Sequence, residues 1–278
     1  MKKIPRFCGV LLSVVVLLVL LLPARESNAP VRLYFLDVGQ GDATLIRTPD
    51  GDVLIDTGTN ASERELMLRL KRLGVQKLRL LVLSHADEDH VGGADAVLSS
   101  LSVEEVWIGA DTDFGEPFLR VLEEIRARQI PLYSPVAEEV RSIGTLVFEI
   151  LSPMLHTGWK GNNGSLVFRF CYGNLRVLFM GDVESDVEEE ICLRYVSRLA
   201  CDVYKVPHHG AATNAGHRVA EAASPQYAVI FCSRDNSYGH PHGQQLELLH
   251  SVGASVLRTD LLGEILIEYD GTEVKYVP

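Results

Sequence analysis

Short apolar runs alternate along the chain with segments whose apolar residues recur every three or four positions. From Ser62 to Leu73 the apolar residues follow helical spacing, and Gly74 comes directly after them, which indicates an amphipathic helix with a glycine at its C-cap. Leu78–Leu83 is almost entirely apolar, as expected for a strand covered on both faces of its sheet. The alternation of strands and helices predicts a layered α/β fold with two central sheets.

The same pattern predicts elements in both halves of the chain. Further strands are expected at Val31–Leu36, Ala43–Arg47, Val53–Ile55, within Val140–Leu151, and at Ser165–Cys171, Arg176–Phe179, Val203–Val206, Tyr227–Cys232, Val256–Arg258, Glu264–Tyr269 and Thr272–Tyr276. Further helices are expected at Ala94–Leu101, Pro117–Arg128, Glu184–Leu199, His217–Ala223 and Gly243–Ser251. Neither a repeat nor a linker interrupts this order, so residues 30–278 are expected to form one domain.

The first 29 residues have a different character. Lys2, Lys3 and Arg6 precede an apolar run, Phe7–Leu22, and small residues follow at Ser27 and Ala29. This order is typical of a secretory signal peptide cut after Ala29, and an uncleaved membrane anchor through residues 7–22 is the alternative. Either interpretation predicts a protein outside the cytoplasm, secreted or attached to the membrane.

Composition narrows the class of protein. The 278 residues are 47% hydrophobic and 23% charged, which excludes a disordered, collagenous or coiled-coil chain. The net charge of −11, which becomes −14 without residues 1–29, argues against a protein that coats nucleic acid by bulk charge. Four cysteines remain after that segment, and both disulfides and buried free thiols are compatible with their positions: Cys171, Cys192, Cys201 and Cys232.

Histidines and aspartates gather where predicted strands end. His85, Asp87, Asp89 and His90 follow the strand that ends at Leu83, and a loop in that position is where α/β proteins place their sites. Imidazole and carboxylate groups are good ligands for Zn²⁺ or Mn²⁺, whereas a solvated acidic loop is the alternative interpretation.

Residues further along the chain favour a metal site over a solvated acidic loop. Asp182 follows a second apolar strand, and the pair His208 and His209 follows a third. His240 and His242 come next, so six of the nine histidines lie in three clusters. A random distribution of surface histidines would not have this pattern.

Several motifs in a fixed order resemble those of one family. They are Phe35–Ala43, Leu54–Gly58, His85–His90, Asn162–Val167, Gly181–Asp182, Pro207–Gly210 and Tyr238–His242. Together they resemble the metallo-β-lactamase fold superfamily, and in particular the hydrolase domain of ComEC-type competence proteins and its standalone relatives. The resemblance covers residues 31–269 and implies an αββα sandwich, with two central mixed sheets and helices on the outer faces.

The resemblance also implies roles for single residues. His85 and Asp87 match ligands of a first metal ion, with Asp87 in place of the family's usual histidine, and the family's middle histidine has no counterpart. Asp89, His90 and His209 match the ligands of a second ion, and Asp182 matches the residue that bridges the two. One or two divalent ions, Zn²⁺ or Mn²⁺, are therefore expected.

The remaining roles follow from the expected reaction, in which a metal-bound hydroxide near Asp89 attacks the substrate. His240 or His208 is expected to protonate the leaving oxygen. Asn163, Ser165 and His242 are expected to contact the substrate. Asp37, Asp42 and Asp56 are expected to support the metal ligands without binding the ion themselves.

The leading functional hypothesis is an extracytoplasmic metal-dependent phosphodiesterase, a nuclease acting on DNA or another phosphodiester, with no protein partner. The alternatives are a hydrolase of a small ester, lactone or β-lactam, and a non-catalytic binding protein on the same fold. A group of cations is either a DNA-binding patch or an ordinary solvated face: Arg64, Arg69, Lys71, Arg72, Lys77 and Arg79.

Overall fold

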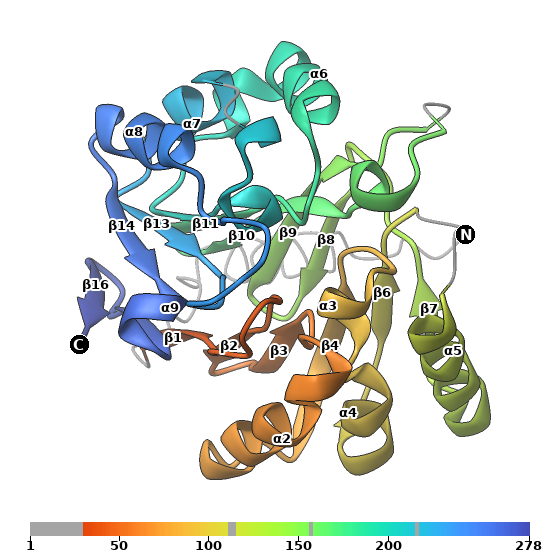
Figure 1. Cartoon of the computed structure of the whole chain (residues 1–278). Helices are drawn as coiled ribbons and strands as arrows, with labels where there is room; N and C mark the ends of the chain where they lie inside the picture. Colours follow the sequence, from red (N-terminus) through yellow and green to blue (C-terminus); the bar gives the residue numbers. More distant parts are fainter. Residues whose placement is uncertain (1–29, 111–114, 156–157, 215–216) are drawn as a thin grey trace, which may run out of the picture.

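Two mixed β-sheets lie face to face in the computed structural model, with helices on both outer sides (Figure 1). The structure describes residues 30–110, 115–155, 158–214 and 217–278, so the predicted signal or anchor segment lies outside the described residues. Among the described residues, none of the helices has the length and apolarity needed to span a membrane. The predicted αββα architecture is confirmed.

The first sheet has an antiparallel half and a parallel half. Its order is β16-β15-β1-β2-β3-β4-β6-β7, with β5 paired to β4. The strands are β1 (Val31–Phe35), β2 (Thr44–Thr48), β3 (Gly51–Ile55), β4 (Lys77–Leu83), β5 (Ser102–Val103), β6 (Val106–Ile108), β7 (Leu132–Tyr133), β15 (Ile265–Tyr269) and β16 (Val274–Val277). Pairing is parallel from β3 to β7 and antiparallel elsewhere.

The second sheet is divided in the same way. Its order is β14-β13-β12-β11-β10-β9-β8, antiparallel from β8 to β11 and parallel from β11 to β14. The strands are β8 (Val140–Ile143), β9 (Leu146–Ser152), β10 (Val167–Tyr172), β11 (Leu175–Phe179), β12 (Val203–Lys205), β13 (Tyr227–Ile230) and β14 (Ser255–Arg258). The parallel halves matter for function, because the candidate site residues follow β4, β11 and β12.

Helices cover the outer face of each sheet (Figure 1). Over the first sheet lie α2 (Glu63–Arg72), α4 (Ala94–Ser100) and α5 (Glu116–Arg128), and over the second lie α6 (Ser185–Tyr195), α7 (His217–Ala223) and α8 (Gly243–Ser251). Shorter helices are α3 (Glu88–Val91), α9 (Thr259–Leu262) and the 3₁₀ turns Asn60–Ser62, Gly161–Gly164, Val196–Arg198, Pro207–Gly210 and Ala212–Asn214.

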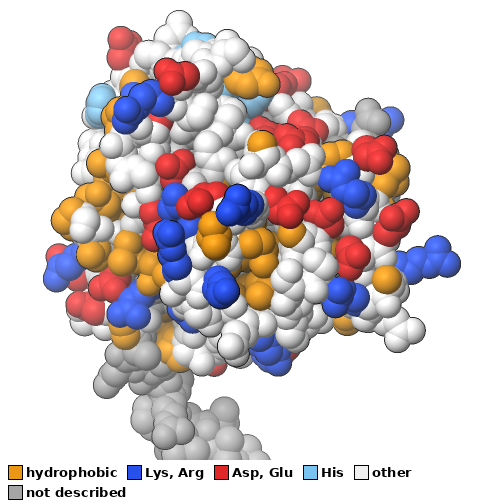
Figure 2. Space-filling model, turned by 60° about the horizontal axis from the view of Figure 1, so that its bottom comes forward, with side chains coloured by type: hydrophobic (Ala, Val, Ile, Leu, Met, Phe, Trp, Pro, Cys, Tyr) orange, Lys and Arg blue, Asp and Glu red, His pale blue; other side chains and the backbone are white. Residues whose placement is uncertain are grey.

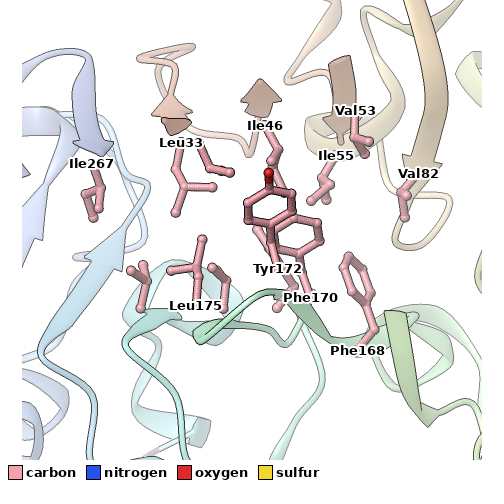
Figure 3. Packing of buried hydrophobic residues seen from close by; sticks show 14 of the residues in the cluster. Leu33, Ile46, Val53, Ile55, Val82, Phe168, Phe170, Tyr172, Leu175 and Ile267 are labelled. Carbon is pink, nitrogen blue, oxygen red and sulfur yellow. The ribbon is translucent and has the colours of Figure 1, made fainter. Parts of the chain in front are cut away.

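The main hydrophobic core fills the space between the sheets (Figure 3). Leu33, Ile46 and Val53 of the first sheet face Phe168 and Phe170 of the second. Alternate residues of each strand point into this layer, as the period of a β-strand requires. The other residues of the central strands pack under the outer helices, so the strands are apolar on both faces.

The predicted helices and strands differ from the structure mainly at their ends. The helix predicted over Glu184–Leu199 ends at Tyr195, and a separate 3₁₀ turn carries the chain on to buried Leu199. The strands β5, β6 and β7 were absent from the prediction, because two or three residues are too few to show a period. All four cysteines named above are free and buried, so the interpretation as buried thiols is confirmed.

One buried carboxyl group gives the fold a pH dependence. Glu188 lies on the inner side of α6, and burial raises the pKa of its carboxyl group from 4.5 to about 8. Between these values the unfolded chain has lost the proton and the folded chain keeps it, so this group lowers stability as the pH rises through that window. We expect Glu188→Gln to be more stable than the wild type at pH 8.5, by on the order of 3 kcal/mol, and nearly equal at pH 5.

Guanidinium unfolding at the two pH values measures this difference. Glu189→Gln is the matched control, because Glu189 is the exposed neighbour on the same helix. An equal difference between Glu188→Gln and the wild type at both pH values would show that the carboxyl group is not held protonated by the fold.

Candidate metal centre

Four predicted ligands come together at the ends of three strands. Asp89 and His90 lie on α3, directly after β4, whereas Asp182 follows β11 and His209 follows β12. One ligand atom from each of the four lies within 4.8 Å of the others. Three segments distant in the sequence therefore come together at one end of the β-sandwich, where β4, β11 and β12 end.

The distances inside this group suit a divalent cation. His209 Nε2 lies 3.0 Å from Asp89 Oδ2 and 3.4 Å from Asp182 Oδ2, and His90 Nε2 lies 3.3 Å from the same Asp182 oxygen. His90 Nε2 is buried and has no hydrogen-bond partner among the described residues. Two imidazole nitrogens and two carboxylates are a ligand set for Zn²⁺ or Mn²⁺, so the residues fit the ion that the sequence predicts.

His85 and Asp87 lie beside this group rather than in it. The His85 ring is buried with its centroid 4.1 Å from that of His90, and its Nε2 has no hydrogen-bond partner among the described residues. Asp87 Oδ2 lies 3.7 Å from that nitrogen, on a side chain that is 52% exposed. This pair is in place to extend the site, and its role as ligands of a further ion remains a prediction.

Two buried aspartates lie behind the ligands. Asp56 Oδ2 lies 2.9 Å from His90 Nδ1, and the Ser84 amide and hydroxyl donate to the same carboxylate at 2.7 and 2.8 Å. Asp42 Oδ1 lies 3.5 Å from His209 Nδ1, which also lies 3.1 Å from the Phe231 carbonyl oxygen. A partner at Nδ1 leaves Nε2 directed at the centre, which is the geometry of an orienting residue.

The turn that carries Asp37 and Asp42 packs directly on the metal-binding loop. The Asp42 amide donates to the Asp89 carbonyl at 3.1 Å, and a Cβ on Gly41 would come within 2.5 Å of that oxygen. Gly41 is therefore required for the close approach. Asp37 has a more local task than predicted, because its carboxylate accepts from the Gly39 amide at 3.2 Å within the turn.

Lys205 is a site residue that the sequence interpretation missed. Its buried ammonium group donates to the Gly181 carbonyl at 2.9 Å, lies 3.2 Å from Asp182 Oδ1 and forms an ion pair with Asp42. Burial lowers the pKa of Lys205, but Asp42 and Asp182 outweigh this effect and raise it, so the group stays charged. The signal in the sequence is a lysine inside a short apolar strand that ends in the histidine pair.

The centre concentrates negative charge that a cation must balance. Burial lowers the pKa of His209, yet the carboxylates of Asp182, Asp42 and Asp89 raise it to about 10. Burial raises the pKa of Asp89, yet His90 and His209 lower it to about 2. The carboxylates therefore remain ionised at neutral pH, and protons and a divalent ion compete for the same imidazole nitrogens.

Two predicted substrate contacts have other tasks in the structure. Ser165 is fully buried, and its hydroxyl donates to the Asn162 carbonyl at 2.6 Å and accepts from the Asp182 amide at 3.1 Å. It positions Asp182 instead of facing a substrate, which corrects the expectation. Asn163 Oδ1 accepts from the Glu184 amide at 2.8 Å and so fixes the start of α6.

The other three histidines of the predicted site, His208, His240 and His242, lie around the centre. His240 lies with its ring centroid 6.0 Å from that of His209, and the pKa of His240 is lowered to about 4 by burial and by the neighbouring histidines. Burial also lowers the pKa of His208, so both rings are neutral at pH 7. His242 accepts a hydrogen bond at Nδ1 from the Ala212 amide at 3.1 Å and so holds the loop before α8.

A cavity of 460 Å³ opens over the centre. Its lining includes Asp89, Asp182 and His209 of the ligand group, together with His208 and His240. The further lining residues are Gln40, Thr59, Asp87, Glu88, Asn162 and Tyr238. Asp89, with a side chain that is 31% exposed, is the ligand most open to a substrate in this cavity.

Three of the six cations in the candidate basic patch, Arg69, Lys77 and Arg79, form ion pairs with carboxylates. Arg69 lies 3.0 Å from Glu65 and 3.1 Å from Glu264, and Arg79 lies 2.7 Å from Glu104. On the face formed by α2 and α4, Lys and Arg side chains lie among Asp and Glu (Figure 2). This mixture favours the interpretation as an ordinary solvated face.

The fold agrees with the comparisons to known proteins. The metallo-beta-lactamase superfamily model matches residues 36–234, and the chain belongs to this superfamily. ComE operon protein 3 of Bacillus subtilis is 31% identical over 97% of this chain and 37% of its own length. Competence protein ComA of Neisseria gonorrhoeae is 32% identical over 86% of this chain and 32% of its own length.

These relatives define a narrower class. The chain is a metallo-β-lactamase-fold protein related to ComEC-type competence proteins, and it spans about a third of the length of these curated relatives. The metallo-beta-lactamase fold protein YhfI of Bacillus subtilis superposes with a TM-score of 0.58 at 13% identity, over 87% of this chain and all of its own, which supports the fold.

Proposed function

We propose that the protein is a metal-dependent phosphodiesterase that cleaves DNA outside the cytoplasm. The observation that carries this proposal is the convergence of Asp89, His90, Asp182 and His209 beneath an open cavity, whose lining includes all of them except His90. The kinship with competence proteins favours nucleic acid as the substrate. The location rests on the predicted export segment in residues 1–29, and fractionation of cells that make the full chain tests it.

The residues in and around the ligand group have different roles in the proposed reaction. A bound divalent ion would polarise a phosphoryl oxygen and make water acidic enough to react at neutral pH. Asp89, as the most exposed ligand, borders the space in which a phosphodiester would lie. His240 and His208, which line the same space and are neutral at pH 7, are in place to donate a hydrogen bond to the leaving oxygen.

A substrate panel tests the proposal. The purified protein, with Mn²⁺ or Zn²⁺ and with a chelator as control, is assayed on a single-stranded oligonucleotide, on bis-p-nitrophenyl phosphate and on a chromogenic β-lactam. We expect both phosphodiesters to be hydrolysed and the lactam to be left intact, because Asp87 and the missing middle histidine change the first metal position. Turnover of the lactam without cleavage of either phosphodiester would contradict the proposal.

A further inference from the structure

A row of aromatic rings leads from the metal centre to the surface of the cavity. The ring of His209, a candidate ligand, is followed by that of His240, with centroids 6.0 Å apart and planes 27° apart. The Tyr238 ring comes next, 5.5 Å from His240 at an interplanar angle of 20°. Each ring is thus nearly parallel to the next, and Tyr238 is the outermost.

Tyr238 is exposed to an extent that its surroundings do not explain. It is 65% exposed, although it is a large aromatic side chain at the wall of a candidate active site. One face of its ring packs toward His240, which leaves the other face open for a flat partner. An aromatic surface in this position is typical of a binding site.

The segment that carries Tyr238 is held in place before any ligand arrives. Asn236 Nδ2 donates to the Ser233 carbonyl at 2.8 Å and to the His240 carbonyl at 2.7 Å. The His240 amide donates back to Asn236 Oδ1 at 2.9 Å. These bonds bracket Tyr238 on both sides, so binding against its ring requires little further ordering.

Charge does not supply affinity for nucleic acid at this cavity. Asp87 and Glu88 are exposed at its wall, and the whole chain has a net charge of −11. Stacking of a base on an aromatic ring does not depend on net charge and tolerates any sequence. The open face of Tyr238 therefore offers the kind of contact that an acidic nuclease needs.

We infer that Tyr238 is a stacking platform for a nucleobase next to the phosphate at the metal centre. This inference rests on the proposed phosphodiesterase function and narrows its substrate to single-stranded nucleic acid. In a duplex the faces of a base are covered by its neighbours, so only an unpaired or frayed base can stack on Tyr238.

Kinetics on two oligonucleotides of equal length test the platform. Oligo-thymidine carries bases, whereas an abasic oligonucleotide has the same phosphodiester backbone without them. We expect Tyr238→Ala to raise KM for oligo-thymidine about 5- to 150-fold, the range for loss of one base stack, and to leave KM for the abasic strand within about twofold. Tyr238→Phe keeps the ring and is expected to behave like the wild type.

The matched control is Leu193→Ala, which removes a 66% exposed apolar side chain on α6. A hairpin duplex is expected to be a poorer substrate than oligo-thymidine for the wild type. The inference is overturned if Tyr238→Ala changes KM equally for both strands or for neither, or if the duplex is cleaved as well as the single strand.

A binding measurement distinguishes a failure of the stacking inference from a failure of the proposed function. Fluorescence anisotropy measures the affinity of a phosphorothioate oligo-thymidine and of the labelled abasic strand. If the wild-type protein cleaves no phosphodiester, the proposed function is refuted. The role of Tyr238 as a stacking platform is then tested by the binding measurements alone. Weaker binding of the thymidine strand by Tyr238→Ala, with Tyr238→Phe unchanged, supports the platform, and equal binding of both strands by the wild type refutes it.

Discussion

Asp182→Asn is expected to bind divalent metal at least about 100-fold more weakly than the wild type and to lose hydrolysis to the same extent. Loss of a residue that only supports a ligand typically costs 10- to 100-fold, so loss of the ligand itself should cost at least the upper value. Asp182 Oδ2 is the atom that both His90 and His209 approach within 3.4 Å. Metal content after gel filtration and a phosphodiester assay measure the two effects.

Asp186→Asn is the matched control for this variant. Asp186 lies four residues further along on an exposed position of α6, so the same change of charge there should leave metal content and hydrolysis unchanged. Circular dichroism shows whether Asp182→Asn is folded. A folded Asp182→Asn that keeps wild-type metal content and rate would remove Asp182 from the ligand set.

Lys205→Met is expected to lose about 3 to 5 kcal/mol of unfolding free energy at neutral pH in the metal-free protein. Its ammonium group is paired with Asp42 and Asp182, and both carboxylates stay buried when it is removed. Breaking a buried ion pair in this way is costly because the remaining buried carboxylates lose the cation that balances their charge. Denaturant unfolding in a chelator measures the loss.

A second substitution sharpens this test. Adding Asp42→Asn to Lys205→Met removes one of the two carboxylate charges that Lys205 balances, so we expect the double variant to recover part of the lost stability. Lys71→Met is the control, since Lys71 is exposed on α2 and its loss should change stability by less than about 0.5 kcal/mol. A Lys205→Met variant as stable as Lys71→Met would mean that Lys205 does not balance the buried carboxylates.

The sequence predicted most of the fold because the central strands bury both faces and the outer helices bury one. Runs such as Leu78–Leu83 and Val203–Val206 are recognisable for that reason. The short strands β5 to β7 exist only through their pairing to β4 and β6, which no local pattern records. The early end of α6 likewise depends on tertiary packing that places Leu199 in the core.

The sequence predicted those site residues whose role can be recognised from the residue type and the surrounding motif. Asp89, His90, Asp182 and His209 are aligned by motifs, and the structure brings them together. The direction of a side chain within a tight turn is not encoded in this way, which is why Ser165 was expected to face a substrate although it supports Asp182 from behind. Lys205 was missed because its role depends on two carboxylates, Asp42 and Asp182, that come from distant segments of the chain.

The central claim is that a divalent ion held by Asp89, His90, Asp182 and His209 carries the hydrolysis. The most direct test adds Mn²⁺ stepwise to chelator-treated protein and follows bound metal and cleavage of a single-stranded oligonucleotide together. We expect no cleavage at the start and a rise in step with bound metal that ends at one or two ions per chain. Full cleavage by the metal-free protein, or full metal binding without any cleavage, would contradict it.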